Sequence, residues 1–173
     1  MRLTLRILSL LLVLSVTGTA LGASQRKVPA YEKYIKQYSS LAIQHQKKYR
    51  IPASITLAQG LLESGAGRSE LARKSNNHFG IKCHSDWRGG RVYHDDDLRG
   101  ECFRKYKNPE QSYEDHARFL VDRPRYASLF KLKITDYKGW ARGLQKCGYA
   151  TDRAYANRLI KLIEDEDLDR YDT

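Results

Sequence analysis

A glutamate at the end of a predicted helix is the residue of this chain best suited to acid catalysis. Glu63 follows Leu62 and comes just before Gly65 and Gly67, so it belongs to the last helical turn. The negative end of the helix dipole disfavours a carboxylate there, and apolar neighbours disfavour it by desolvation. Both effects raise the pKa, so we expect Glu63 to keep its proton near neutral pH, as a general acid must. The competing interpretation is an ordinary solvated glutamate.

A second set of side chains that could take part in proton transfer lies further along the chain. Three adjacent aspartates at positions 95–97 precede Gly100, a pattern typical of a solvated turn and occasionally of a cation site. Tyr149 and Tyr155 follow a glycine in a later loop. For either tyrosine, the competing interpretation is core packing with a hydrogen-bonded hydroxyl group.

The helix that must position the glutamate shows one apolar face. Pro52 suits the first helical position, because its fixed φ is that of a helix. Ile51, Ile55, Ala58 and Leu62 then recur at helical spacing. We expect this face to lie in the core and the flank that carries the carboxylate to lie beside it.

The rest of the chain reads as further helices around a small β region. Helical periodicity disappears between positions 78 and 106, where short apolar runs alternate with polar turns, which indicates a few short strands. The predicted fold class is therefore α+β, predominantly α, with a small β lobe. The other predicted helices are one over residues 31–49, a short one capped by Ser69, one that starts at Pro109 and stops at Pro124, one capped by Thr135, and a last one capped by Thr151 or Asp152.

The first residues have the order of a secretory signal peptide. Arg2 and Arg6 precede an apolar segment over residues 7–16, and small residues follow up to Gly22. The apolar segment is too short to span a bilayer comfortably. We therefore assign residues 1–22 to a cleaved signal peptide and expect no stable membrane anchor afterwards.

The remaining chain is expected to form one exported domain. We assign residues 23–30 to a short linker, 31–165 to the folded domain and 166–173 to an acidic tail that frays. The formal charge is +11, and two of these charges belong to the signal peptide, which leaves +9. Such a domain suits an anionic surface such as a cell wall. Because Lys and Arg are scattered and the chain is predicted to be exported, we expect no nucleic-acid partner. We also expect the protein to be a monomer.

Three cysteines would reach an oxidising compartment if the signal peptide acts as predicted. Cys83 and Cys102 bracket the β region and lie 19 positions apart, so we favour a disulfide between them. Such a loop closure is worth about 3 kcal/mol in the chain-entropy estimate. The odd count leaves Cys147, which lies among helical residues, as a buried free thiol.

Two other uses of these cysteines compete with the disulfide. A cysteine peptidase would pair a thiolate of Cys83 or Cys102 with His94 or His116, but no nucleophile motif surrounds either cysteine. A zinc site is conceivable, but its ligand spacing matches no recognised pattern. The ligands of that zinc site would be His78, Cys83, His84 and His94. Because the pattern is not a recognised one, we expect no metal, and we also expect no cofactor.

The segment LLESGAGRSELARKSNNHFGIK, residues 61–82, resembles the core motif of the bacterial glucosaminidases of glycoside hydrolase family 73. That family includes the muramidase-like domain of flagellar peptidoglycan hydrolases. In it, the glutamate of the helix-ending ESG-like segment is the general acid, and this position is Glu63. The resemblance covers roughly residues 31–163 and implies a lysozyme-like helical domain with the β lobe beside an active-site groove. An N-x-F-G-x-K segment follows the glutamate in the family and corresponds here to Asn77, Phe79, Gly80 and Lys82.

The resemblance also implies roles for residues outside this motif. A second acidic residue of the family lies in the β region, and its best match is Asp96, with Asp95 as the near alternative. A tyrosine near the family's active site follows a glycine, which assigns that role to Tyr149 and less firmly to Tyr155. The residues expected to contact substrate are Asn77, Phe79, Trp87, Asp95 and Tyr155.

The activity that the resemblance implies is cleavage of the β-1,4 bond after N-acetylglucosamine in peptidoglycan. Asp96 would then activate water or act as a nucleophile, or the substrate's own N-acetyl group would assist with Tyr149 nearby. A lytic transglycosylase, which cyclises muramic acid instead of adding water, has a similar fold and also uses a helix-borne glutamate. The non-enzymatic alternative is a wall-binding module that retains the groove without catalysis.

Overall fold

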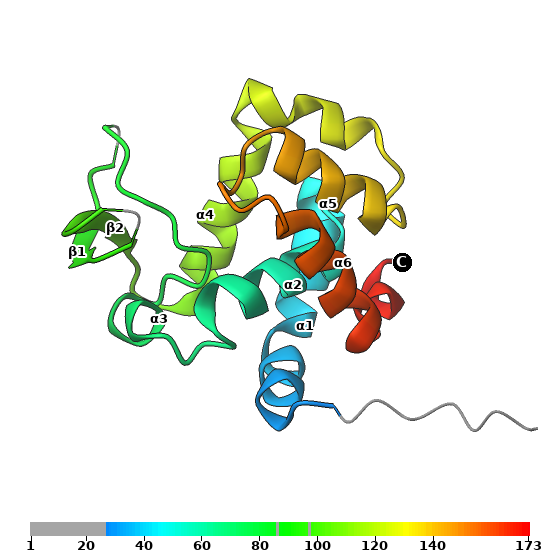
Figure 1. The fold of residues 1–173 in the computed structure, drawn as a ribbon, viewed down its shortest axis with the longest axis horizontal. Coiled ribbons are helices and arrows are strands. Elements are labelled where there is room, and N and C mark those ends of the chain that lie inside the picture. The colour runs from blue at the N-terminus through cyan, green and yellow to red at the C-terminus, as the bar shows by residue number, and fades with distance from the viewer. Residues whose placement is uncertain (1–26, 86, 97) are drawn as a thin grey trace, which may run out of the picture.

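A computed structural model describes residues 27–85, 87–96 and 98–173. The predicted signal peptide and the first half of the predicted linker, residues 23–26, lie outside these described residues. Within these ranges, none of the helices combines the length and the apolarity that a bilayer crossing needs. The structure is predominantly helical with one two-stranded antiparallel sheet, which confirms the predicted fold class (Figure 1).

Helix α2, Ala53–Ser64, lies in the middle of the helical part (Figure 1). It packs against α1, Pro29–Tyr49, on one side and against α5, Tyr137–Lys146, and α6, Tyr155–Asp165, on others. The predicted apolar face lies in the core at Ile51, Ile55 and Ala58, but burial extends beyond that face to every residue over 53–61. The central position explains the difference, because a helix surrounded by other elements is buried all round.

The end of α2 is set by its glycine-rich sequence. Pro52 takes the N-cap position and not the first helical position, and Gly65 ends the helix in the left-handed conformation with φ 57°. Gly67 also has positive φ, 74°, so the chain reverses sharply just after the last helical turn. Glu63 is thereby held in the last turn of α2, as the sequence predicts.

The remaining helices follow the predicted order but differ in some caps. Ser69 is the N-cap of α3, Glu70–Ser75, and Asn108 is the N-cap of α4, Pro109–Val121, as predicted. Asp136 caps α5, where Thr135 was predicted, and α6 begins after Ala154, so neither predicted cap of α6 holds that position. Asp152 instead accepts a hydrogen bond from the backbone N–H of Ala154 at 2.8 Å. The other helical elements are the 3₁₀ helices η1, Pro124–Lys131, and η2, Leu168–Tyr171.

The β lobe consists of β1, Gly90–His94, and β2, Glu101–Lys105, paired antiparallel. A disulfide joins Cys83 to Cys102, the pair that the sequence favours, and so ties the lobe to the chain segment before it. Cys147 is free, as expected, but it is half-buried and not fully buried, because it caps the exposed end of α5.

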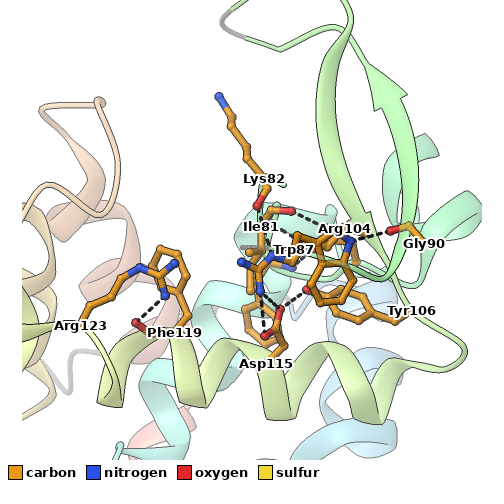
Figure 2. A network of polar contacts seen from close by, with 11 residues as sticks. Ile81, Lys82, Trp87, Gly90, Arg104, Tyr106, Asp115, Phe119 and Arg123 are labelled. Carbon is orange, nitrogen blue, oxygen red and sulfur yellow. Dashed lines mark hydrogen bonds and ion pairs between the residues drawn. The ribbon is translucent and has the colours of Figure 1, made fainter. Parts of the chain in front are cut away.

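One side chain of β2 fastens the lobe to the helical part. Arg104 Nη1 donates to both carboxylate oxygens of Asp115 on α4, each at 3.0 Å, and Tyr106 donates its hydroxyl to the same carboxylate at 2.5 Å. Arg104 is also stacked over the ring of Trp87, at 4.6 Å from the ring centroid. Figure 2 shows these side chains converging above α4. A partly buried ion pair therefore helps to fix the orientation of the lobe.

The C-terminal tail is ordered and does not fray as predicted. Leu168 is fully buried, and Asp172 accepts hydrogen bonds from the backbone N–H of Ser54 at 2.8 Å and from its hydroxyl group at 2.5 Å. Gln46 donates to the backbone oxygen of Thr173 at 2.9 Å. The reason is that the tail supplies the acceptors that the N-terminus of the buried helix α2 needs.

We expect Asp172→Ala to lower the free energy of unfolding by about 1–3 kcal/mol, because buried donors of Ser54 lose their acceptor. Urea unfolding followed by circular dichroism measures this change. Asp169→Ala is the matched control, since the side chain of this tail aspartate is exposed. Equal stability of the two variants would contradict a structural role for the tail.

Candidate active site

A cavity of about 460 Å³ opens beside the last turn of α2. Glu63 and Leu62 line it from α2, the β-lobe segment closes a second side, and the loop before α6 closes a third. Phe119 of α4 and Arg125 of η1 complete the lining, so the cavity is built where several separate stretches of the chain meet. Its polar and charged lining residues are Glu63, Lys82, His84, Asp96, Arg125, Tyr149, Thr151, Asp152, Tyr155 and Arg158.

The carboxyl group of Glu63 is set up to keep a proton near neutral pH. The pKa of Glu63 is raised to about 7, mainly by burial; the hydrogen bond from Tyr155 lowers it, and the negative charge of nearby Asp96 raises it. The hydroxyl group of Tyr155 donates to Glu63 Oε1 at 2.9 Å. A carboxyl group with this pKa can both hold and release a proton at pH 7, which suits a general acid.

Two tyrosines stand over this carboxyl group. Tyr149 and Tyr155 are stacked with their ring centroids 5.6 Å apart, and both line the cavity. Burial raises the pKa of each phenol well above its ordinary value, so both hydroxyl groups stay protonated. They can therefore donate hydrogen bonds in the cavity but cannot act as bases near neutral pH.

Of the predicted acidic residues in the β lobe, the structure places one at the cavity. Asp96 lines it and forms an ion pair with Lys82 Nζ at 3.3 Å. Asp95 is not part of the lining; its carboxylate accepts from the backbone N–H of Gly100 at 2.7 Å and so stabilises the turn between the strands. Asp97 lies outside the described residues.

Asn77 was predicted to contact substrate, but the structure gives it an internal role. Its side chain is 1% exposed and does not line the cavity. The amide nitrogen donates to the backbone oxygens of Ile81 and Arg104 at 2.9 and 3.0 Å, and the amide oxygen accepts from the N–H of Ile81 at 3.1 Å. Asn77 therefore folds the loop that leads to Lys82 and fastens it to β2. A buried amide with several partners is costly to replace, since each unpaired group loses its hydrogen bond.

Phe79 is both a core residue and part of the cavity wall. It is 3% exposed and lines the cavity, and its ring stacks on His116 with centroids 3.9 Å apart and planes 12° apart. The sequence left these two interpretations open, and the geometry fits both. Phe79 is therefore a buried part of the cavity wall.

Trp87 was predicted to contact substrate at the same site, and the structure places it elsewhere. It lines a separate hollow with Tyr106 and Glu110 beside α4, outside the lining of the Glu63 cavity. Its indole N–H donates to the backbone oxygen of Gly90 at 2.8 Å, and Arg104 covers one of its faces (Figure 2). The Trp87 side chain therefore packs against the contacts of Arg104, Tyr106 and Asp115 that anchor the β lobe to α4.

Several cavity residues were not singled out from the sequence. Arg125 lines the rim with its guanidinium group 4.7 Å from the ring centroid of Tyr126, and Phe119 lies next to it. Phe119 is in turn covered by Arg123, whose guanidinium group lies 3.7 Å from the ring centroid (Figure 2). Arg158 forms an ion pair with Asp152 at 3.2 Å across the α6 end of the cavity. Two segments that resemble the glucosaminidase family offered a sequence signal: RPRYASLF, residues 123–130, contains Arg125, and GYATDRAYANRL, residues 148–159, contains Arg158.

The structure also bears on the two alternative sites. Both cysteines of the β region are in the disulfide, so neither provides the thiolate that a cysteine peptidase or the zinc site would use. In the part of the chain that the structure describes, no three His, Cys, Asp or Glu side chains converge as metal ligands would.

A proton-holding glutamate at the end of a buried helix, above a cavity closed by a β lobe, is the arrangement of a lysozyme-like glycosidase. Comparison with known proteins agrees. The family model described as "Mannosyl-glycoprotein endo-beta-N-acetylglucosaminidase" matches residues 39–168. The chain belongs to this glucosaminidase family of glycoside hydrolases.

The chain is similar in sequence to two bacterial proteins named for glycan or peptidoglycan cleavage. The exo-glucosaminidase LytG of Bacillus subtilis is 39% identical over 140 residues, which cover 73% of this chain and 48% of LytG. The peptidoglycan hydrolase FlgJ of Vibrio parahaemolyticus is 32% identical over 147 residues, 79% of this chain and 47% of FlgJ. This chain thus spans about half the length of the relatives that it matches.

Solved structures show the same fold. The catalytic domain of the autolysin Auto from Listeria monocytogenes superposes with a TM-score of 0.71 at 32% identity, covering 84% of this chain and 89% of that domain. The glycoside hydrolase domain of FlgJ from Salmonella typhimurium gives a TM-score of 0.65 at 28% identity, covering 79% and 88%. The predicted family is thereby confirmed.

Proposed function

We propose that this protein hydrolyses the glycan strands of peptidoglycan at the β-1,4 bond after N-acetylglucosamine, with Glu63 as the general acid. The observation that carries the proposal is the carboxyl group of Glu63, which lies in the cavity, receives a hydrogen bond from Tyr155 and has a pKa of about 7. In the reaction, Glu63 gives its proton to the leaving oxygen while positive charge develops on the sugar ring.

The group that completes the reaction is proposed to be Asp96 or the substrate itself. Asp96 lines the same cavity and is held by Lys82, so it can activate water or attack the sugar from the lobe side. In the substrate-assisted route, the N-acetyl oxygen attacks, and the hydroxyl group of Tyr149 is the nearby donor. Asp96→Asn separates the routes, because it abolishes the first two and leaves the third largely active.

We further propose that the protein acts as an exported monomer on the cell wall, in a periplasm or outside the cell. This proposal rests on the signal-like residues 1–22, the disulfide between Cys83 and Cys102, and the charge of +9 on the mature chain. Cleavage within strands is proposed, and LytG, named an exo-glucosaminidase, marks the competing mode. Endo-cleavage releases long fragments early, whereas exo-cleavage releases small ones from the start.

Digestion of purified peptidoglycan tests the proposal. Mass spectrometry of borohydride-reduced products should find reduced N-acetylglucosamine at the new ends. Anhydromuramic ends would instead assign the transglycosylase reaction, and reduced muramic acid ends would assign a muramidase. Retention on the wall without any released fragment would assign the binding module.

The pH dependence follows from the protonation of Glu63. The acid works only while protonated, so kcat/KM should stay high below the pKa of about 7 and fall about tenfold per pH unit above it. Initial rates on soluble glycan fragments at subsaturating concentration measure this profile. A decline that begins near pH 4.5, the ordinary value for a glutamate, would show that Glu63 is not held protonated as proposed.

A further inference from the structure

A buried histidine stands at the end of a hydrogen-bond chain that reaches Glu63. His116 on α4 is fully buried, and its Nε2 lies 3.1 Å from the amide oxygen of Gln59 on α2. The amide nitrogen of Gln59 donates to the hydroxyl oxygen of Tyr155 at 2.9 Å, and Tyr155 donates to Glu63 at 2.9 Å. Three helices thus contribute one continuous chain, whose last acceptor is the proposed catalytic carboxyl group.

The amide group gives this chain a direction. Because the oxygen of Gln59 faces His116, the ring nitrogen Nε2 must carry a proton. Burial lowers the pKa of His116 to about 3, so the ring is neutral and its other nitrogen, Nδ1, carries a lone pair. Since the hydroxyl oxygen of Tyr155 accepts from Gln59, its own hydrogen is free to point at Glu63. The donor end of the chain is His116 and the acceptor end is the carboxyl group.

The surroundings of His116 disfavour the opposite direction of the hydrogen bonds, in which the Gln59 amide would donate to His116. Reversal would place the proton on Nδ1, and among the described residues Nδ1 has no hydrogen-bond partner. The imidazole is stacked on Phe79 at 3.9 Å, with the edge of Tyr149 nearby, so this side is lined by aromatic rings. A buried N–H without an acceptor is rarer and costlier than an acceptor without a donor. The forward direction is therefore favoured.

We propose that His116, acting through Gln59, is a positioning residue that holds the Tyr155 hydroxyl as a donor to Glu63 and so keeps the catalytic acid able to release its proton. The inference rests on the proposed function of Glu63 and adds that the hydrogen bonds from His116 limit how strongly Glu63 holds its proton. A donor to the carboxylate stabilises the charged form, which offsets part of the burial that favours the neutral form. Without it, Glu63 would be a weaker acid.

Other charged groups face both ends of the chain and belong to different elements. The residue facing His116 is His45 on α1. The group that acts on Glu63 from the β lobe is Asp96. None of these groups takes part in the hydrogen bonds from His116 to Glu63. A substitution of His116 therefore breaks that series of hydrogen bonds and leaves these other groups in place. The remaining charged groups that line the cavity are Lys82, Arg125, Asp152 and Arg158.

The test compares His116→Phe, Tyr155→Phe and the double variant. His116→Phe keeps a ring against Phe79 but removes the N–H donor. The basic limb of the pH profile, where kcat/KM falls as Glu63 loses its proton, should therefore move to higher pH by up to about one pH unit. Tyr155→Phe removes the final donor and should move the limb in the same direction by at least as much. In the double variant the limb should lie where Tyr155→Phe alone puts it, because both changes break one chain.

Two variants separate positioning from general damage to the fold. His116→Gln restores an N–H donor and should return the limb towards the wild-type position. Tyr113→Phe lies on the same helix and removes another fully buried hydroxyl group, which donates to Tyr34 at 2.8 Å outside the chain. It should leave the limb in place even if it lowers stability. A folded His116→Phe protein whose limb does not move, or a double variant whose shifts add, would overturn the proposal.

A second readout does not depend on turnover. In protein with carbon-13-labelled glutamate, the carboxyl signal that disappears in Glu63→Gln reports the titration of Glu63. Its midpoint should rise in His116→Phe and return in His116→Gln. If the wild type cleaves no peptidoglycan while this midpoint still moves, the proposed function fails and the positioning role of His116 stands. An unmoved midpoint overturns the positioning role whatever the activity.

Discussion

Glu63→Gln should lower kcat on peptidoglycan by about 10²–10⁴-fold, the range expected when a positioned general acid is lost. Glutamine has nearly the same shape, so the last turn of α2 and the cavity should persist. Its amide oxygen can still accept from the hydroxyl group of Tyr155, which now donates to Glu63 at 2.9 Å. What the variant lacks is the proton that the leaving oxygen needs. Release of reducing ends from purified peptidoglycan, measured at pH 6 and at equal enzyme concentration, gives the ratio.

The control for this variant is another helical glutamate. Glu70 lies exposed at the start of α3 and pairs with Lys74, away from the cavity. Glu70→Gln should therefore keep the wild-type rate. A Glu63→Gln protein that is folded and retains more than about a tenth of the activity would mean that another group supplies the proton. Thermal unfolding of both variants shows whether the fold is retained.

Arg104→Ala should lower the free energy of unfolding by about 3 kcal/mol, the low end of the cost of leaving one partner of a buried ion pair alone, because Asp115 is only partly buried. Arg104 is 6% exposed, and both of its hydrogen bonds to Asp115 measure 3.0 Å. The substitution leaves the Asp115 carboxylate under the β lobe without its cation and removes the group stacked on Trp87 (Figure 2). Urea unfolding at pH 7 measures the loss.

Two further variants sharpen this prediction. Lys105→Ala changes an exposed cation next to Arg104 on the same strand and should alter stability by no more than about 0.5 kcal/mol. Adding Asp115→Asn to Arg104→Ala should recover part of the loss, because the uncompensated charge is then removed. If Arg104→Ala unfolds at the same urea concentration as Lys105→Ala, the ion pair does not hold the lobe.

The same lobe carries part of the proposed chemistry. Lys82 and Asp96 reach the cavity from the chain segments that β2 and the disulfide hold in place. The anchor around Arg104 thus stabilises the domain and also sets the distance across which Asp96 faces Glu63. A lobe that moved would change the separation of the two carboxyl groups, on which the stereochemical course depends.

Local sequence rules predicted the frame of the site well. Gly65 follows Glu63 closely, and a glycine at that place predicts a helix end, which the structure has. The apolar spacing of α2 failed to predict how deeply the helix is buried, because spacing within one segment does not show which segments far along the chain cover it. Ser54 and Gln59 are polar and yet buried, since Asp172 and His116 supply their partners.

Residues expected at the substrate illustrate the same limit. Asn77 stands in a motif next to the cavity wall, but its amide is used up by the backbone of its own loop and of β2. Trp87 has the side chain that sugars prefer, but its ring is covered by Arg104. In each case the residue type was right for the proposed role, and a partner distant in the sequence decided the actual contact. Tyr155 shows the converse, because it reaches the site through a hydrogen bond to Glu63, which lies 92 positions away in the sequence.

The measurement that tests the central claim most directly is digestion of peptidoglycan in oxygen-18 water, followed at once by borohydride reduction and mass spectrometry. Hydrolysis after N-acetylglucosamine predicts one oxygen-18 atom in each new reduced N-acetylglucosamine end, and no such ends with Glu63→Gln at the same enzyme concentration and time. Ends that carry oxygen-18 on muramic acid, or anhydromuramic ends without oxygen-18, would contradict the account.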